Sequence, residues 1–428
     1  MGPAAVPLRQ YVVHITWAGN AALRPAEYVG LGIPASELRD WLDGATLLLR
    51  IRPRTVAGAQ TLERFRNLCA RQARTGDHVQ PLVLQISQGT LKALILRLRQ
   101  GPLAEDRQLG EELAAALRAV SEPLPFSTRI GGRTFAWGQR TWVMGIINLT
   151  PDSFSGDGLL RAGQDPASVA ERAAERALQF EQSGADILDL GAESTRPGAA
   201  GVSAQVEMER LLPALRAIRA RTALPISVDT SKAEVAREAL AAGADLINDV
   251  TGLQGDPAMS ETVRRAGCPA VLMHNRSRGR VLRDARLGGH YVTAPYDDLI
   301  LDVLEQTAAL LDAALAAGIR REQLILDPGL GFGKTVRQNL ALSSWTQALR
   351  ALGQPILFGS SHKSFLGQVL RLPPDQRMQA SLASVAAAVA SGAADIIRVH
   401  DVAAAVETVR LVDALRSASL GSPRMGGR

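Results

Sequence analysis

The chain is poor in cysteine, in aromatic side chains and in lysine. Its two cysteines, Cys69 and Cys268, lie far apart, with no CxxC motif and no histidine cluster beside either. We therefore expect free thiols, and neither a disulfide nor a metal site. Aromatic residues make up only 4% of the sequence, and its basic residues are scattered singly. With so few rings for base stacking, the net charge of +6 favours an anionic small molecule or a solvated surface over nucleic acid.

Long apolar runs are missing as well. No segment approaches the roughly eighteen uncharged apolar residues that a membrane-spanning helix needs. The first nine residues lack the basic start and the apolar core of a secretory signal. We expect a cytoplasmic protein that binds no membrane.

Lysine occurs at only four positions, and the remaining basic residues are arginine. A lysine that persists in such a chain is expected where its compact, strongly hydrated ammonium group is needed. Three of the four, Lys232, Lys334 and Lys363, lie within polar motifs that follow predicted strands.

The chain is rich instead in short apolar strands that alternate with segments long enough to form helices. Eight such strands lead into polar residues. They are Trp142–Asn148, Ala185–Gly191, Ile226–Asp229, Asp245–Asp249, Ala270–His274, Leu324–Asp327, Pro355–Gly359 and Ala394–His400. This alternation predicts an α/β fold, a (β/α)8 TIM barrel, with the chemistry at the carboxyl ends of the strands.

Residues 1–125 have a different pattern and are predicted to form a smaller α+β domain without a chemical motif. Its expected strands and helices are Tyr11–Thr16, Thr46–Ile51, Val56–Gln72, Pro81–Ile86 and Gln108–Val120. The barrel domain, 126–417, opens with a predicted hairpin at Phe126–Trp137. Residues 418–428 are expected to be a disordered tail. The segment Asn275–Pro295, rich in arginine and glycine, is predicted to be a mobile flap.

The polar residues that follow the strands should converge on one charged pocket, because the parallel strands of a barrel all end at the same face. They are Asn148, Glu193, Asp229, Asn248, His274, Asp327, Lys363, Arg398 and His400. Asp229 and Asn248 end neighbouring strands, and a carboxylate beside a carboxamide suits the donor and acceptor edge of an amino-pyrimidinone. Either residue alone would equally suit a helix N-cap.

A second set of these residues suits an anion. Arg398 and His400 lie two residues apart on one strand and so face the same side, and the last strands of such barrels often bind phosphate. Asn148 can offer its carbonyl to a cation or its amide to an anion. The stretch Gly329–Gly333 lacks the spacing of a Walker P-loop. We expect an anionic group at this side of the pocket.

Two polar loops follow the first two strands. The first carries Asp152 and Asp157. The second carries Thr195 and Arg196, and arginine is the residue suited to a diphosphate or a carboxylate. Both loops are expected to lie over the barrel mouth.

Seven motifs, in order and covering about 130–416, resemble those of dihydropteroate synthase. They are M-G-I-I-N-L-T-P-D-S-F-S (144–155), D-L-G-A-E-S-T-R-P-G (189–198), S-V-D-T-S-K (227–232), I-N-D-V (247–250), L-D-P-G-L-G-F-G-K (326–334), G-S-S-H-K-S (359–364) and R-V-H-D-V (398–402). The resemblance implies a transferase of folate biosynthesis. It would condense 6-hydroxymethyl-7,8-dihydropterin diphosphate with 4-aminobenzoate to give 7,8-dihydropteroate and diphosphate. It also implies Mg²⁺ as a cofactor, inhibition by sulfonamides and a homodimer.

The resemblance assigns roles to the pocket residues. Asp157 would stabilise the positive charge that develops on the pterin as its methylene–oxygen bond breaks, and Arg398 and His400 the charge on the departing diphosphate. Lys363 would complete the catalytic set, and Asn148 would hold Mg²⁺. The substrate-binding set would be Asp229, Asn248, Asp327 and Lys363 for the pterin, Asp152, Asp157, Thr195, Arg196 and Ser364 for aminobenzoate, and Arg398 and His400 for diphosphate.

His362 departs from the resemblance, since the family usually has arginine at this position. With a reference pKa of about 6.5, a histidine is expected to be mostly neutral at neutral pH, which would weaken aminobenzoate and sulfonamide binding. Two alternatives stay open. A catalytically silent pterin-binding paralogue is favoured only by His362. A pterin-dependent methyltransferase would need neither the E-S-T-R-P-G motif nor the S-x-K-S element.

Overall fold

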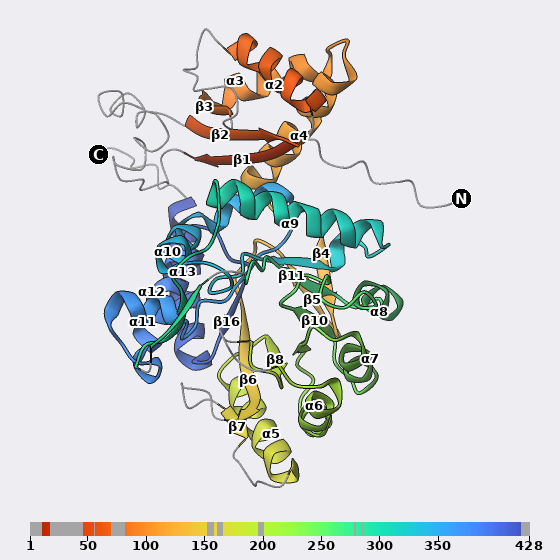
Figure 1. Cartoon of the computed structure of the whole chain (residues 1–428), viewed down its shortest axis with the longest axis vertical. Helices are drawn as coiled ribbons and strands as arrows, with labels where there is room; N and C mark the ends of the chain where they lie inside the picture. The colour runs from red at the N-terminus through yellow and green to blue at the C-terminus, as the bar shows by residue number, and fades with distance from the viewer. Residues whose placement is uncertain are drawn as a thin grey trace, which may run out of the picture.

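The computed structural model describes residues 11–17, 46–54, 56–69, 82–151, 158–160, 166–195, 201–277, 280–284 and 286–420. These residues form a small sheet domain and a barrel, which lie against each other along a barrel helix and the neighbouring segment Thr346–Leu352 (Figure 1). Among them, no helix is long and apolar enough to cross a bilayer.

The barrel is a parallel sheet that nearly closes on itself, as the sequence predicts. Its strands are β6 (Trp142–Pro151), β8 (Ile187–Gly191), β9 (Ile226–Asp229), β10 (Leu246–Asp249), β11 (Ala270–Met273), β14 (Leu324–Asp327), β15 (Leu357–Phe358) and β16 (Ile396–Val399), and β7 (Gly158–Leu160) pairs with β6. The hydrogen-bonded order runs from β14 through β11, β10, β9, β8, β6 and β16 to β15. An isolated bridge between Leu326 and Ile356 joins the two ends. All eight predicted strands are present, within a few residues of their expected bounds.

Helices follow the strands and cover the outside of the barrel. They are α5 (Pro166–Gln182), α6 (Ala204–Arg219), α7 (Ala233–Ala241), α8 (Met259–Ala266), α9 (Leu299–Ala316), α10 (Val336–Trp345), α11 (Ser364–Leu370), α12 (Met378–Ala390) and α13 (Val402–Leu420), with short 3-10 turns at η2 (Arg321–Gln323), η3 (Thr346–Leu352) and η4 (Pro374–Gln376). Gly243 and Gly267 follow α7 and α8 with φ of 106° and 65°, a backbone conformation that favours glycine at a helix end.

The inside of the barrel has an apolar layer below a polar one. The lower layer consists of Met144, Ile187, Leu246, Val271, Ile325, Leu357 and Ile396. It packs on Ile130, Phe135 and Trp137 of the predicted hairpin, formed by β4 (Ser127–Ile130) and β5 (Arg133–Ala136). Because side chains alternate along a strand, the next inward positions lie one layer higher, and there the sequence places Asp189, Asn248, Asp327 and Arg398. The hairpin closes one end of the barrel, so the polar layer is reached from the carboxyl end.

Two segments that were expected to be irregular contain regular structure in part. Within the predicted flap, β12 (Val281–Asp284) and β13 (Gly288–Tyr291) form an antiparallel hairpin. Arg377 Nη2 donates to Leu287 O at 2.9 Å, so this hairpin is tied to the barrel. Helix α13 extends to Leu420, so the first three residues of the expected tail, 418–420, are helical, and 421–428 lie outside the described residues.

The N-terminal domain is a three-stranded antiparallel sheet with helices on one face. Its elements are β1 (Tyr11–Trp17), β2 (Thr46–Pro53), α2 (Val56–Cys69), β3 (Leu82–Ser87), α3 (Gln88–Arg99) and α4 (Ala104–Ser121), of which α3 was not predicted. Tyr11, Val13, Ile15, Leu49 and Ile51 share the buried face and pack with the helices. Alternation therefore turns the arginines of β2 toward the opposite face.

Arginines of β2 and of the residue that follows it dock the sheet on the barrel. Arg50 pairs with Asp298, the N-cap of α9, and Arg52 donates to Asp302 at 2.7 Å. Arg54 donates to Asp312 at 3.4 Å on the same helix. Figure 1 shows α9 running between the three-stranded sheet and the barrel. The junction therefore includes arginines of the sheet that face carboxylates of α9, and Ala351 of η3 packs with the apolar core of the sheet domain.

Candidate active site

Opposite charges meet in the polar layer of the barrel. Arg398 on β16 donates through Nε to Asp189 Oδ2 at 2.6 Å and through Nη2 to Asp229 Oδ2 at 2.7 Å. Asp189 is fully buried, and the Asp229 side chain is 11% exposed. The amide of Asn248 lies 3.4 Å from both Asp189 carboxylate oxygens. The expected neighbours Asp229 and Asn248 are therefore brought together, with Asp189 and Arg398 between them.

A second buried carboxylate faces a lysine in the same pocket. Asp327 Oδ1 accepts the backbone N–H of Gly329 at 2.6 Å. Lys363, the N-cap residue of α11, donates to Leu330 O, and its ammonium lies 4.6 Å from the centre of the Phe332 ring. Gly331 has φ of 83°, and a side chain there would meet the Lys363 stem at 3.0 Å. The glycine-rich loop after β14 therefore packs along the Lys363 side chain.

Burial shifts the titration of these groups toward neutral pH. Desolvation raises the pKa of Asp229 from 3.8 to about 7, although Arg398 opposes the shift. Desolvation also raises the pKa of Asp327, against the effect of Lys363. It lowers the pKa of Lys363 from 10.5 to about 8, while Asp327 acts in the other direction. For Arg398, burial lowers the pKa, but Asp189 and Asp229 outweigh it and the pKa is raised.

A buried lysine braces the glycine-rich loop from below. Lys334 is 1% exposed and donates to Gly329 O at 2.8 Å and to Phe332 O at 3.0 Å. Its ammonium also lies 3.0 Å from His274 Nδ1, whose other ring nitrogen meets Gln306 Oε1 at 3.0 Å. Burial, followed by the neighbouring Lys334, lowers the pKa of His274, which is neutral and accepts from the lysine. His274 is thus a structural partner of the loop.

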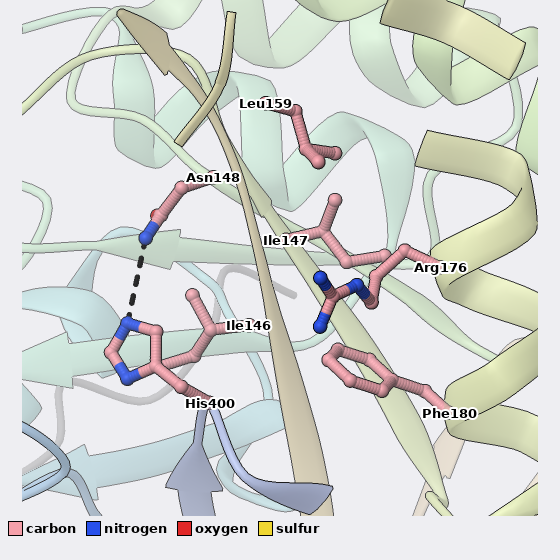
Figure 2. Close-up of a pocket in the computed structure, with 7 residues that line it drawn as sticks. All are labelled: Ile146, Ile147, Asn148, Leu159, Arg176, Phe180 and His400. Atoms are coloured by element: carbon pink, nitrogen blue, oxygen red, sulfur yellow. Dashed lines mark hydrogen bonds between the residues drawn. The ribbon is translucent and has the colours of Figure 1, made fainter. Parts of the chain in front are cut away.

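Asn148 and His400 form a separate corner beside the carboxylates. Figure 2 shows their side chains directed toward each other, with Asn148 Nδ2 3.4 Å from His400 Nε2. His400 Nδ1 lies 2.9 Å from Ser361 Oγ, which also accepts the His400 backbone N–H at 3.2 Å. Arg398 and His400 therefore do not share one contact in this structure. Arg398 lies among the carboxylates, and His400 lies with Asn148.

His362, which was expected to be mostly neutral, lies between two oxygen acceptors. Its Nε2 lies 2.7 Å from Asp401 Oδ2, and its Nδ1 lies 3.1 Å from Pro374 O. A carbonyl oxygen and an ionised carboxylate only accept hydrogen bonds, so these two contacts suit a ring that carries a proton on both nitrogens. The side chain is only 9% exposed and its ring lies 5.0 Å from that of His400. His362 therefore faces Asp401 in a buried arrangement that suits the imidazolium form.

The proposed aminobenzoate residues are only partly described. Thr195 is exposed at the mouth, and Ser364 is the half-buried first residue of α11. Asp152, Asp157 and Arg196 lie outside the described residues. Their predicted roles stay predictions.

The Mg²⁺ expectation can be compared with the oxygen donors present. Within the described ranges, no group of three or more His, Cys, Asp or Glu side chains could hold a metal ion. A side chain at Gly191 would meet Asn148 Oδ1 and Asp229 Oδ2 at 3.9 Å each, so both oxygens border the same space. Magnesium is often held by one or two protein oxygens together with substrate phosphates and water. These residues fit an ion that arrives with a diphosphate.

Several residues of the pocket were missed by the sequence reasoning. Asp189 was taken only as the start of a motif, although a charged residue inside an apolar strand is itself a signal of a paired, inward-facing group. Ser361, Asp401 and Arg377 were missed because their partners are distant in the sequence. Arg377 is 2% exposed and donates to the carbonyls of Leu372, His362 and Leu287.

Comparisons with known proteins agree with this geometry. Residues 144–400 match the family described as pterin binding enzyme. Dihydropteroate synthase of Synechocystis sp. is 40% identical over 300 residues, which cover 70% of this chain and 98% of the relative. The chain belongs to the dihydropteroate synthase family.

Solved structures of dihydropteroate synthases share the barrel. The enzyme of Xanthomonas albilineans with 4-aminobenzoic acid is 38% identical, with a TM-score of 0.59, over 68% of this chain and 99% of that one. The Yersinia pestis enzyme in a sulfonamide drug complex is 39% identical, with a TM-score of 0.60, over 68% of this chain and all of that one. The family match lies within the barrel and does not include the N-terminal sheet domain.

Proposed function

We propose that the chain condenses 6-hydroxymethyl-7,8-dihydropterin diphosphate with 4-aminobenzoate to give 7,8-dihydropteroate and diphosphate. The observation that carries this proposal is the buried polar layer of Asp189, Asp229, Asn248, Asp327 and Arg398 in a chain of the dihydropteroate synthase family. The Xanthomonas albilineans relative holds 4-aminobenzoic acid, and the Yersinia pestis relative holds a sulfonamide. We extend both ligands to this chain, the second as an inhibitor.

The buried groups suit recognition of a pterin. A pterin edge presents N–H donors next to a carbonyl acceptor, so it needs carboxylate and amide partners and one cation. Asp229 and Asp327 would accept from the N–H groups, Asn248 would both accept and donate, and Lys363 would donate to the ring acceptors. Because the site is already desolvated, each charge-assisted hydrogen bond would be stronger than in water.

The chemical step requires stabilisation of two opposite charges. As the methylene–oxygen bond breaks, negative charge grows on the diphosphate, and the corner of Asn148 and His400 lies ready to bind it beside Arg398. Positive charge grows on the pterin, and we assign its stabilisation to Asp157. The aromatic amine of aminobenzoate is nucleophilic when neutral, so no general base is needed. Mg²⁺, held through Asn148, would neutralise part of the diphosphate charge when bound.

We also propose a cytoplasmic homodimer, as the resemblance implies. Sedimentation of the purified chain would give the mass of two subunits. A single-subunit mass at the concentration of the activity assay would contradict the dimer without affecting the proposed reaction.

The test is direct. The purified chain is incubated with dihydropterin diphosphate, aminobenzoate and Mg²⁺, and both released diphosphate and dihydropteroate are measured. We expect the two products in equal amounts, and neither when aminobenzoate is left out. A protein that binds pterin and forms no dihydropteroate would be the silent paralogue. His362 is the feature that favours this alternative, but its contacts with Pro374 O and Asp401 Oδ2 suit a cation, as the usual arginine would be.

A further inference from the structure

The backbone of His362 is held in an unusual conformation by helix α12. Its φ is 54°, in the left-handed region that residues other than glycine rarely adopt. The His362 N–H donates to Ser381 Oγ at 2.9 Å, and its carbonyl accepts from Arg377 Nη1 at 2.9 Å. These two contacts fix the direction of the imidazole ring.

The ring of His362 lies behind the corner formed by Asn148 and His400. Its nitrogens lie within hydrogen-bond distance of Asp401 Oδ2 and Pro374 O, and its ring centre lies 5.0 Å from that of His400, with the two ring planes at 58°. Among the described residues, further charged or titratable groups adjoin it. Arg377, at the start of α12, reaches the carbonyl of His362, Lys363 turns away to Leu330 O, and His400 bonds to Ser361.

We propose that His362 is a positioning residue that acts through His400. As an imidazolium paired with Asp401, it holds positive charge behind the corner of Asn148 and His400 and so strengthens the binding of diphosphate there. The inference rests on the proposed function, because it takes diphosphate as the ligand of this corner. During the catalysed reaction His362 keeps its proton, and no bond to it is made or broken.

The proposal gives a pH dependence of known sign. At low pH the imidazolium satisfies both oxygen acceptors and supplies its charge. As the pH rises and the ring loses a proton, one acceptor loses its donor and the charge disappears, so diphosphate should bind more weakly. Arginine at position 362 would keep its charge over the whole range.

The experiment measures the binding of inorganic diphosphate, in the presence of Mg²⁺, by calorimetry at about pH 6 and about pH 9, where histidine is charged and neutral respectively. The wild type is compared with His362→Gln and His362→Arg. We expect His362→Gln to bind about tenfold more weakly than the wild type at the lower pH and equally at the higher pH. His362→Arg should match the wild type at the lower pH and exceed it at the higher pH.

Two controls separate charge from structure. Asp375→Asn removes an exposed carboxylate next to Pro374 and should leave both titrations unchanged. The affinity for 6-hydroxymethylpterin, which has no phosphate, should be the same in all variants. The proposal would be overturned if the diphosphate affinities of the wild type and His362→Gln differed by the same factor at both pH values. It would also be overturned if His362→Gln lost as much affinity for 6-hydroxymethylpterin as for diphosphate.

Asp401→Asn tests the proposal independently, in case His362→Gln does not fold. In the wild-type background it should weaken diphosphate binding, because the imidazolium loses its partner. When residue 362 is arginine, the same Asp401→Asn change should alter diphosphate binding to the same extent at both pH values. If the chain forms no dihydropteroate and diphosphate binding still follows this pattern, the proposed function fails and the inference about His362 stands.

Discussion

At the scale of single residues, burial is what gives the pocket its chemistry. Desolvation brings the pKa of Asp229 to about 7 and that of Lys363 to about 8, from ordinary values on opposite sides of neutrality. Each group can therefore change its charge within the physiological range. A ligand that replaces the lost hydration will decide which form is present.

The first prediction concerns the pH dependence of pterin binding. Asp229 is protonated below its pKa and ionised above it, and only the carboxylate accepts two hydrogen bonds from pterin N–H groups. The affinity for 6-hydroxymethylpterin should therefore rise between about pH 6 and about pH 8. Calorimetric titration of the wild type and of Asp229→Asn checks this. An equal rise in the asparagine variant would assign the dependence to another group.

The second prediction concerns Asp327. Its replacement by asparagine keeps an oxygen that can accept from Gly329 N–H, so the fold should be retained. Pterin binding should weaken by roughly 1.5–3 kcal/mol, the contribution of a hydrogen bond to a charged group. Calorimetry gives the affinity and thermal unfolding gives the stability. Unchanged affinity would remove Asp327 from the pterin site.

The third prediction separates a buried ion pair from an exposed one. Arg398→Met removes the guanidinium that pairs with the buried carboxylates of Asp189 and Asp229. Because these charges then lack a partner, the free energy of unfolding should fall by about 3–5 kcal/mol. Arg416→Met removes a more exposed partner of Asp413, at 3.8 Å, and should cost about 0–1 kcal/mol. Urea denaturation measures both. Similar losses would mean that Arg398 is better hydrated than its contacts indicate.

At the scale of the elements, one arginine connects three segments around the mouth. Arg377 donates to the β12–β13 hairpin at Leu287, to the loop before α11 at His362 and to Leu372 after α11. Gly367 on α11 faces the guanidinium so closely that a side chain there would overlap it. The hairpin is thus held through side-chain contacts that its own sequence does not encode.

The fourth prediction follows from this connection. Arg377→Met should leave three carbonyls without their donor and should release the hairpin, so that amide hydrogen exchange in 281–291 becomes faster. Exchange in the barrel strands should be unchanged. Arg371→Met, at an exposed position near the end of the same segment, serves as the control. Unchanged protection of the hairpin would show that Arg377 does not hold it.

At the scale of the whole molecule, charge joins the two domains. Asp302 is shared between Arg52 of the N-terminal sheet and Arg276 of the loop after β11, at 2.7 Å and 3.6 Å. Arg276 in turn lies over the Tyr296 ring, and the Tyr296 hydroxyl donates to Gly333 O at 3.2 Å. The junction therefore reaches residues that border the glycine-rich loop of the pocket.

The fifth prediction tests this junction. Arg50→Glu combined with Arg52→Glu places acidic groups against Asp298 and Asp302, and it should lower the free energy of unfolding by about 1.5–3 kcal/mol for each charged hydrogen bond that is lost. Differential scanning calorimetry should show a lower Tm or a separate transition for the sheet domain. Arg97→Glu, on an exposed part of α3, should have little effect. Equal stability of both variants would contradict docking through β2.

The sequence alone determined the barrel, because the signals for it are local. Short apolar strands and helix-length segments alternate, and the residues that follow the strands are polar, so both the fold and the inward-facing Asp229, Asn248 and Asp327 could be predicted. Helix α3 was missed because it begins directly after β3 and has Gly89, a residue unfavourable in helices, in its first turn. The seven motifs indicated the family because each motif is also a short, local stretch of sequence.

Only the tertiary structure decided which of these groups meet. Arg398 pairs with carboxylates 209 and 169 residues earlier in the chain, and His362 meets Asp401 39 residues later. Such contacts depend on the closure of the sheet and on how α12 holds a strained backbone, and neither leaves a pattern in a short stretch of sequence. The charge of His362 illustrates this. Its identity suggested a neutral ring, but the two oxygen acceptors that other segments place around it suit a cation.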